Sequence, residues 1–244
     1  MRIKTYVFIA MCLVLSFSVY AQQRGESPQG ADKPIPLFFR ETFKAPPVAS
    51  PDEIFTTQHV ANPNLEMKLY GPGSKPTPGV ESGLFLVNRG DGLPGSPVVS
   101  FIWSGMTLGN WAVTLKDKNN YLDLTQPGSK FRWRVRPRSF RELRILIRLA
   151  DGTMLIADYA EPNSTFFRET EYYFMDIERW RTIDPATVLE GRDTNWKTNV
   201  DLSKVDEIGF TDLGRGTGHN PAGSSAVDWI EVYGKAVKRP VGGR

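Results

Sequence analysis

The segment KFRWRVRP, residues 130–137, decides the fold class, because its apolar and charged side chains alternate strictly. In an extended strand successive side chains point to opposite faces, so the three apolar residues share one face and the three arginines share the other. The expected core residues are Phe131, Trp133 and Val135, and the outward residues are Arg132, Arg134 and Arg136. The segment therefore predicts a half-buried strand in a sheet with a solvated outer face.

Much of the remaining chain repeats this two-residue period between turn signals. The segment LRILIRLADGTMLIADY, residues 143–159, predicts two strands joined at Asp151-Gly152, a pair favoured in hairpin turns. One short helix is expected at residues 184–191, with Asp184 as its cap. Further strands are expected at residues 37–43, 65–70, 83–88, 98–103, 110–116, 171–178, 206–211 and 226–233. Many short strands with one short helix at most predict an all-β antiparallel β-sandwich.

The N-terminus predicts export and sets the domain boundaries. Two basic residues precede an apolar run that ends at Tyr20, which is typical of a signal peptide and short for a membrane span. We expect cleavage after Ala21; a lipoprotein leader modified at Cys12 and a retained membrane anchor are the alternatives. The expected parts are a signal peptide (1–21), a disordered spacer (22–34), one β-sandwich domain (35–236) and a flexible tail (237–244).

Composition narrows the function classes. The single cysteine lies in the predicted leader, so disulfides, cysteine-bound metals and thiol catalysis are not expected in the mature chain. The leader holds two of the 30 basic residues and none of the 27 acids, which leaves the mature chain close to neutral and argues against nucleic acid as a partner. Export without disulfides favours a bacterial protein, secreted or periplasmic, with no membrane span after cleavage.

The last strands carry a resemblance to a known fold family. The segments VDEIGFTDL (205–213) and SSAVDWIEVYG (224–234) look like the closing strand pair of galactose-binding-like jelly rolls, a superfamily that includes many carbohydrate-binding modules. The resemblance covers residues 97–234 and rests on strand order and short phrases. It implies a jelly-roll sandwich with carbohydrate as partner. It also implies a structural calcium between the first and last strands, held by Glu41 and Asp228; the alternative is that both are ordinary surface or capping carboxylates.

The glycine-rich stretch DLGRGTGHNPAGSS, residues 212–225, is a candidate ligand-binding loop. A phosphate-binding loop needs a lysine where Ser224 stands, and a dinucleotide fingerprint needs a helix where a strand pattern follows. The stretch is therefore expected to connect two strands. Asp212 and His219 could bind a polar ligand together with their neighbours in the loop, and the alternative is a solvated loop without a ligand.

Arginines define the second candidate site. If the strands 130–137 and 143–149 pair, Arg132, Arg134, Arg144 and Arg148 share one sheet face, and the next strand adds Asp158. Guanidinium groups bind carboxylates and sulfates in a bidentate manner, so this face would suit an acidic glycan. The alternative is a solvated face on which acids of neighbouring strands neutralise the arginines.

Tryptophans supply the third candidate, because sugar rings stack on aromatic platforms. Trp103 and Trp111 lie near strand ends, as do Trp180 and Trp196; each is otherwise a core residue. We found no catalytic motif, and no pair of carboxylates has a signature spacing. The sequence predicts a secreted, non-catalytic carbohydrate-binding sandwich. The alternatives are a polysaccharide lyase or glycoside hydrolase on the same fold, or a structural or adhesion domain.

Overall fold

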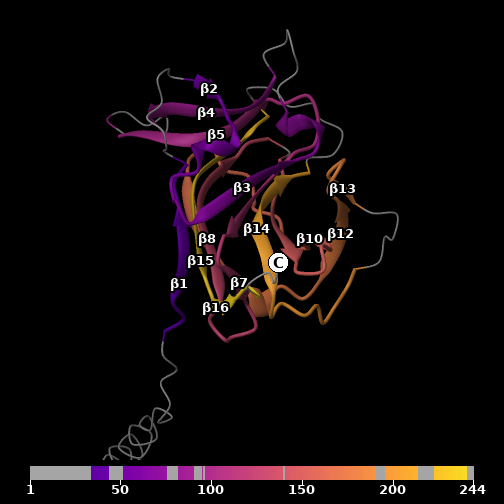
Figure 1. The fold of residues 1–244 in the computed structure, drawn as a ribbon. Coiled ribbons are helices and arrows are strands. Elements are labelled where there is room, and N and C mark those ends of the chain that lie inside the picture. Colours follow the sequence, from indigo (N-terminus) through magenta and orange to yellow (C-terminus); the bar gives the residue numbers. More distant parts are fainter. Residues whose placement is uncertain are drawn as a thin grey trace, which may run out of the picture. The chain divides into compact units, whose positions relative to one another are not determined.

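The computed structural model consists of two antiparallel sheets, which confirms the predicted all-β sandwich (Figure 1). It describes residues 34–43, 52–75, 82–90, 95, 97–139, 141–190, 196–213 and 223–240. The chain divides into two compact units, residues 1–34 and 35–244, and nearly all described residues belong to the second. Within these ranges there is no α-helix, and no helix is long and apolar enough to span a membrane.

The first sheet has seven strands, and β15 lies at its centre. β8 pairs along one edge of β15, while β5 and β1 pair along the other. In order the strands are β11 (Arg168–Tyr173), β8 (Lys130–Pro137), β15 (Ser225–Tyr233), β5 (Val98–Met106), β4 (Gly83–Gly90) and β2 (Asp52–Ile54), with β1 (Leu37–Glu41) beside β15.

The second sheet has nine strands and forms the other layer. In Figure 1 its strands β10 and β12 lie to the right, whereas β8 and β15 of the first sheet lie to the left. In order its strands are β13 (Leu189–Glu190), β12 (Trp180–Asp184), β10 (Met154–Ala157), β9 (Leu143–Leu149), β14 (Val205–Asp212), β6 (Ala112–Asp117) and β3 (Leu65–Tyr70), with β7 (Asn120–Asp123) beside β14 and β16 (Lys235–Lys238) beside β7. Three short 3-10 helices complete the described part: η1 (Thr57–His59), η2 (Pro72–Ser74) and η3 (Phe174–Asp176).

The core lies between the sheets, where alternation predicted it. The apolar face of β8 is fully buried, with Phe131, Trp133 and Val135 each at 0% exposure. Trp133 packs edge-on against Phe131 at 5.2 Å between ring centroids and against Phe210 of β14 at 6.5 Å. Aromatic side chains of both sheets therefore meet in one core.

A β-bulge in β15 changes which of its residues face outward. The register with β8 shifts between Val227 and Trp229, so Val227 and Ile230 both point into the core although they are three residues apart. Trp229 faces outward instead: it is 8% exposed, belongs to no cluster between the sheets, and has the guanidinium of Arg40 4.9 Å above its ring. The period-two rule fails here because the bulge adds one residue.

The hairpin at Asp151-Gly152 is confirmed: β9 pairs with β10, and Gly152 has φ +92°. The helix expected at 184–191 is wrong, because residues 185–188 form a turn between β12 and β13. Asp184 still acts as a cap, since its Oδ1 accepts from the amide of Ala186 at 2.9 Å. Val188 ends the turn with φ +52° and a fully buried side chain, and this burial favours the turn over a helix.

The flexible tail was predicted to begin at residue 237, but the last strand continues past this residue. β16 runs to Lys238 and pairs with β7, and the Arg239 side chain donates to the carbonyl of Asp117 at 3.0 Å. The folded region therefore extends beyond residue 236, because the strand pattern KAVK continues directly after Gly234. The predicted leader and spacer lie almost entirely outside the described residues.

Candidate functional site

The single arginine face that we expected does not exist. β8 and β9 do not pair; β8 belongs to the first sheet and β9 to the second. The strand-pairing assumption was wrong because β8 pairs with β15 and β11, whereas β9 pairs with β10 and β14. The four arginines are therefore divided between two outer faces.

On the first sheet, carboxylates of neighbouring strands pair with both arginines. Arg132 forms ion pairs with Glu231 of β15 at 2.9 Å and with Glu171 of β11 at 3.4 Å. Arg134 pairs with Asp228, which stands at the bulge of β15, at 2.6 Å. The sequence analysis gave this arrangement, in which acids of neighbouring strands neutralise the arginines, as the alternative to a ligand-binding face.

On the second sheet, Arg144 and Arg148 are also bound within the protein. Arg144 donates to the carbonyls of Ala157 at 3.1 Å and Asp158 at 2.7 Å. The Asp158 carboxylate instead accepts from Arg179 at 2.9 Å. Asp158 therefore does not extend an arginine-binding face as expected.

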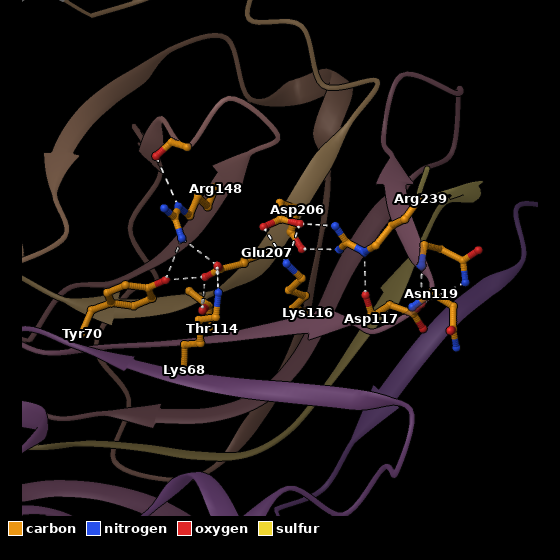
Figure 2. Close-up of polar contacts among 12 residues, drawn as sticks. Lys68, Tyr70, Thr114, Lys116, Asp117, Asn119, Arg148, Asp206, Glu207 and Arg239 are labelled. Atoms are coloured by element: carbon orange, nitrogen blue, oxygen red, sulfur yellow. Dashed lines mark hydrogen bonds and ion pairs between the residues drawn. The ribbon is translucent and has the colours of Figure 1, made fainter. Parts of the chain in front are cut away.

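Arg148 belongs to a compact group that we call the Glu207 cluster: Lys68, Tyr70, Thr114, Arg148 and Glu207 (Figure 2). The Glu207 side chain has 0% exposure, and its oxygens accept from Lys68 at 2.8 Å, Tyr70 at 2.8 Å, Thr114 at 2.7 Å and Arg148 at 3.0 Å. Donors from three neighbouring strands thus converge on one carboxylate of β14. A buried charge of this kind is tolerated because it is fully hydrogen-bonded.

Protonation in the Glu207 cluster follows from these contacts. Burial on its own would raise the pKa of the Glu207 carboxyl, but hydrogen bonds from Lys68, Thr114 and Tyr70 outweigh burial and lower this pKa. Burial and the hydrogen bond to Glu207 raise the pKa of the Tyr70 phenol. Tyr70 therefore keeps its proton and Glu207 its charge near neutral pH, which suits a structural cluster.

The two carboxylates proposed for calcium already bind protein groups. Glu41 is buried, and its Oε1 accepts from the amides of Thr42, Phe43 and Ala61, while Oε2 accepts from Asn62 at 3.0 Å. These bonds give Glu41 a structural role in joining β1 to the segment before β3. Among the described residues no group of three or more metal-binding side chains occurs. The calcium hypothesis has no support from these contacts and stays a prediction.

The glycine loop supplies no described ligand-binding site. Asp212 is buried and accepts from Ser225 at 2.7 Å, so it is a structural residue. His219 lies outside the described residues. Trp111 is 1% exposed, and Trp180 is 2% exposed; both are core residues, as the alternative held.

Trp103 differs from these tryptophans because it lies half-buried on the outer face of β5. It belongs to what we call the outer aromatic cluster, which the sequence analysis missed: Phe85, Val87, Val99, Phe101, Trp103, Phe167 and Ala226. The signal was present in VVSFIW, residues 98–103, where apolar residues occupy both alternating faces of the strand. Val87, Phe101 and Ala226 are buried at 2% exposure, whereas the other four members are partly exposed, and these four make this part of the sheet face a candidate interaction surface.

The Trp103 ring is held from two sides. Its Nε1 donates to the hydroxyl of Ser224 at 2.8 Å. A Cβ atom built on Gly105 would stand only 2.0–2.7 Å from three atoms of the indole, so the ring lies directly against this glycine. The absence of a side chain at Gly105 therefore fixes where the indole can lie.

Two cavities adjoin Trp103. The first has a volume of about 450 Å³ and is lined by Val87, Arg89, Gly90, Phe101, Trp103, Arg136 and Arg138. The second, of about 400 Å³, is lined by Asp52, Ile54, Phe85, Trp103 and Met106. Both volumes fall within the range of small-molecule sites. Arg89 of the first cavity and Asp52 of the second form an ion pair, and Trp103 lines both.

Comparisons with known proteins bear only on the fold. No family model and no curated protein matches the chain. The family 11 carbohydrate-binding module from Clostridium thermocellum, solved with a β-1,3-1,4-mixed-linked tetrasaccharide, matches with a TM-score of 0.41 and 15% identity over 77% of this chain and 98% of the module.

The family 11 module of a cellulosomal cellulase from the same organism matches with a TM-score of 0.41 and 16% identity over 70% of this chain and 88% of that one. An exo-β-agarase matches with a TM-score of 0.37 and 8% identity, over 84% of this chain but 25% of the agarase. At these values the likeness concerns the β-sandwich alone and carries no argument about a ligand. The galactose-binding-like subtype stays a prediction.

Proposed function

We propose that this protein binds a carbohydrate on the outer face of its first sheet, with Trp103 as the platform. The observation that carries the proposal is the position of Trp103: a half-buried indole, fixed by Ser224 and Gly105, that lines two cavities. A pyranose ring has an apolar face that stacks on such a ring and a rim of hydroxyls that needs polar partners. Asp52 and the arginines of the first cavity are such partners.

The acidic-glycan preference that the sequence suggested needs other arginines than the four first considered. Arg132, Arg134 and Arg148 each pair with a carboxylate, and Arg144 is bound to two backbone carbonyls and Glu142. Export to a secreted or periplasmic location remains part of the proposal, and it rests on the predicted leader.

The described residues favour binding over hydrolysis. A glycoside hydrolase of the common type needs two carboxylates across the scissile bond. Among the described residues that line the two cavities, Asp52 is the one carboxylate, and it pairs with Arg89. The buried Glu161 accepts from the Trp133 indole at 3.2 Å and from the Thr170 hydroxyl at 2.9 Å, and its side chain has 0% exposure, so these contacts give it a structural role.

Titration calorimetry and affinity electrophoresis with soluble neutral and acidic polysaccharides test the proposal. We expect binding to at least one of them and a loss of about tenfold or more in Trp103→Ala, because central aromatic anchors dominate binding energy. The matched control is Trp196→Ala, since Trp196 is also half-buried but lies under the guanidinium of Arg181, 4.1 Å away. Equal losses in both variants, or no binding to any glycan, would favour the structural or adhesion alternative.

A further inference from the structure

The first cavity beside Trp103 is distinguished by its charge. Three of its seven lining residues are arginines, Arg89, Arg136 and Arg138, and none of its described lining residues is acidic. The second cavity holds Asp52 and no cationic residue in its described lining. The two cavities that Trp103 lines therefore differ in the charge of their described lining, although Arg89 and Asp52 pair with each other.

Arg138 differs from the outward arginines of β8 that precede it. Arg132 and Arg134 pair with Glu231 and Asp228, whereas the Arg138 side chain has no ion pair or hydrogen bond within the described part of the chain. Its backbone is fixed, because its amide donates to the carbonyl of Ser224 at 3.0 Å. Ser224 also holds the Trp103 indole, so one residue positions both groups.

Arg136 is oriented by aromatic rings of the same cluster. Its guanidinium lies 4.6 Å from the centroid of Phe167 and 5.5 Å from that of Phe101. Stacking on these two rings fixes the position of the guanidinium, which adds positive charge to the lining of the cavity. Arg89 at the end of β4 also lines this cavity, with 60% of its side chain exposed, and it pairs with Asp52 of the second cavity.

We infer that this cavity is a subsite for the anionic substituent, a carboxylate or a sulfate, of a sugar stacked on Trp103. Arg138 brings a positive charge without an acidic partner among the described residues to a concave space that Arg136 and Arg89 also line, and this charge attracts an anion. Carboxylates and sulfates also match the bidentate geometry of arginine. The inference rests on the proposed function, and it names acidic glycans as the ligand class through Arg138, Arg136 and Arg89.

Matched ligands test it: oligogalacturonate against its methyl ester, and a sulfated against an unsulfated galacto-oligosaccharide. We expect the wild-type protein to bind each anionic member about tenfold more tightly, and this preference to weaken with added salt. Arg138→Gln should lose most of the preference, so that its affinities for the anionic and the neutral member of each pair become nearly equal. Trp103→Ala should lose affinity for both.

The control is Arg179→Gln, which removes the same charge from the second sheet, where Arg179 is 51% exposed and pairs with Asp158. Equal binding of neutral and anionic members overturns the subsite but leaves glycan binding intact. An unchanged preference in Arg138→Gln, or equally tight binding of polyphosphate, also overturns it, because the attraction is then not local. Binding of neither member overturns the proposed function itself.

Discussion

Arginine side chains have different partners on the outer faces of the two sheets. On the second sheet Arg148 projects from β9 and meets Glu207 of β14, which also receives donors from β3 and β6. On the first sheet Arg136 projects from β8 and meets the rings of Phe101 and Phe167. Alternation along a strand places an arginine outward, but the neighbouring strand decides whether a carboxylate neutralises it or an aromatic ring supports it.

We expect the outer face of the second sheet to contribute to stability and that of the first sheet to contribute to binding. The Glu207 cluster holds a charge that has been removed from water, so the fold depends on the donors around it. The outer aromatic cluster lies beside two cavities, so its side chains can change without loss of the core between the sheets. We therefore expect variants of the second face to alter the free energy of unfolding and variants around Trp103 to alter ligand binding.

The largest expected effect is that of Glu207→Gln. This change removes the charge from a site with 0% exposure and leaves Lys68 and Arg148 without their carboxylate, and we expect a loss of about 3 kcal/mol in the free energy of unfolding. Urea denaturation measures it. The control is Glu169→Gln, since Glu169 is 55% exposed and its contact with Arg132 is 3.8 Å, and it should change little. A loss below about 1 kcal/mol at Glu207 would show that the cluster is not a structural clamp.

The same carboxylate predicts a pH dependence. The pKa of Glu207 is lowered from its ordinary value of 4.5 in the folded state, so the stability that it contributes is fully present above that value and is lost as the pH falls through the folded-state pKa. The difference in unfolding free energy between wild type and Glu207→Gln should therefore narrow at acidic pH. Urea unfolding at pH 7 and pH 3 measures this gap, and a constant gap would contradict the prediction.

Sequence reasoning predicted the strands and the core but not the strand neighbours. The alternation in β8 and the Asp-Gly turn after β9 are local features, and both are confirmed. The partner of β8 is β15, about 95 residues further on, and no local pattern states this pairing. Two neighbouring segments were therefore assigned to one sheet although a crossover separates them.

The candidate site was predicted only in part, again because the sequence does not state which strands are neighbours. Trp103 was named from the sequence, but so was Trp111, which is buried; the difference depends on the face of each strand that the fold covers. Ser224 and Gly105 could not be identified, because their roles arise from contacts with the indole. The bulge at Asp228 also places Val227 and Ile230 on the same face of β15, and a single inserted residue has no reliable signal in one sequence.

A third prediction tests the independence of binding from stability. In Gly105→Ala the new Cβ meets the Trp103 ring, so the indole must move, and we expect about a tenfold loss of glycan affinity for a stability cost of about 1 kcal/mol. Gly152→Ala is the matched control. It strains a turn with φ +92° at a similar cost, but it lies between β9 and β10 and should leave binding unchanged. Loss of affinity in both variants would mean that stability, not ring position, controls binding.

Arg132→Ala should have the smallest effect on stability and binding. It tests whether an arginine of the first sheet that lies outside both cavities contributes to either property. Its partner Glu231 keeps Arg40 at 2.8 Å and the Tyr233 hydroxyl at 2.9 Å, and Trp229 keeps Arg40 above its ring. We therefore expect a stability loss of only about 0.5 kcal/mol by urea denaturation, because Arg132 is 32% exposed and its contacts are duplicated. Glycan affinity and its salt dependence should equal those of the wild type in calorimetry, since Arg132 lines neither cavity. A tenfold loss of acidic-glycan binding would instead place the anion site on β8 near Glu231 and would remove the distinction between neutralised and ligand-binding arginines on this face.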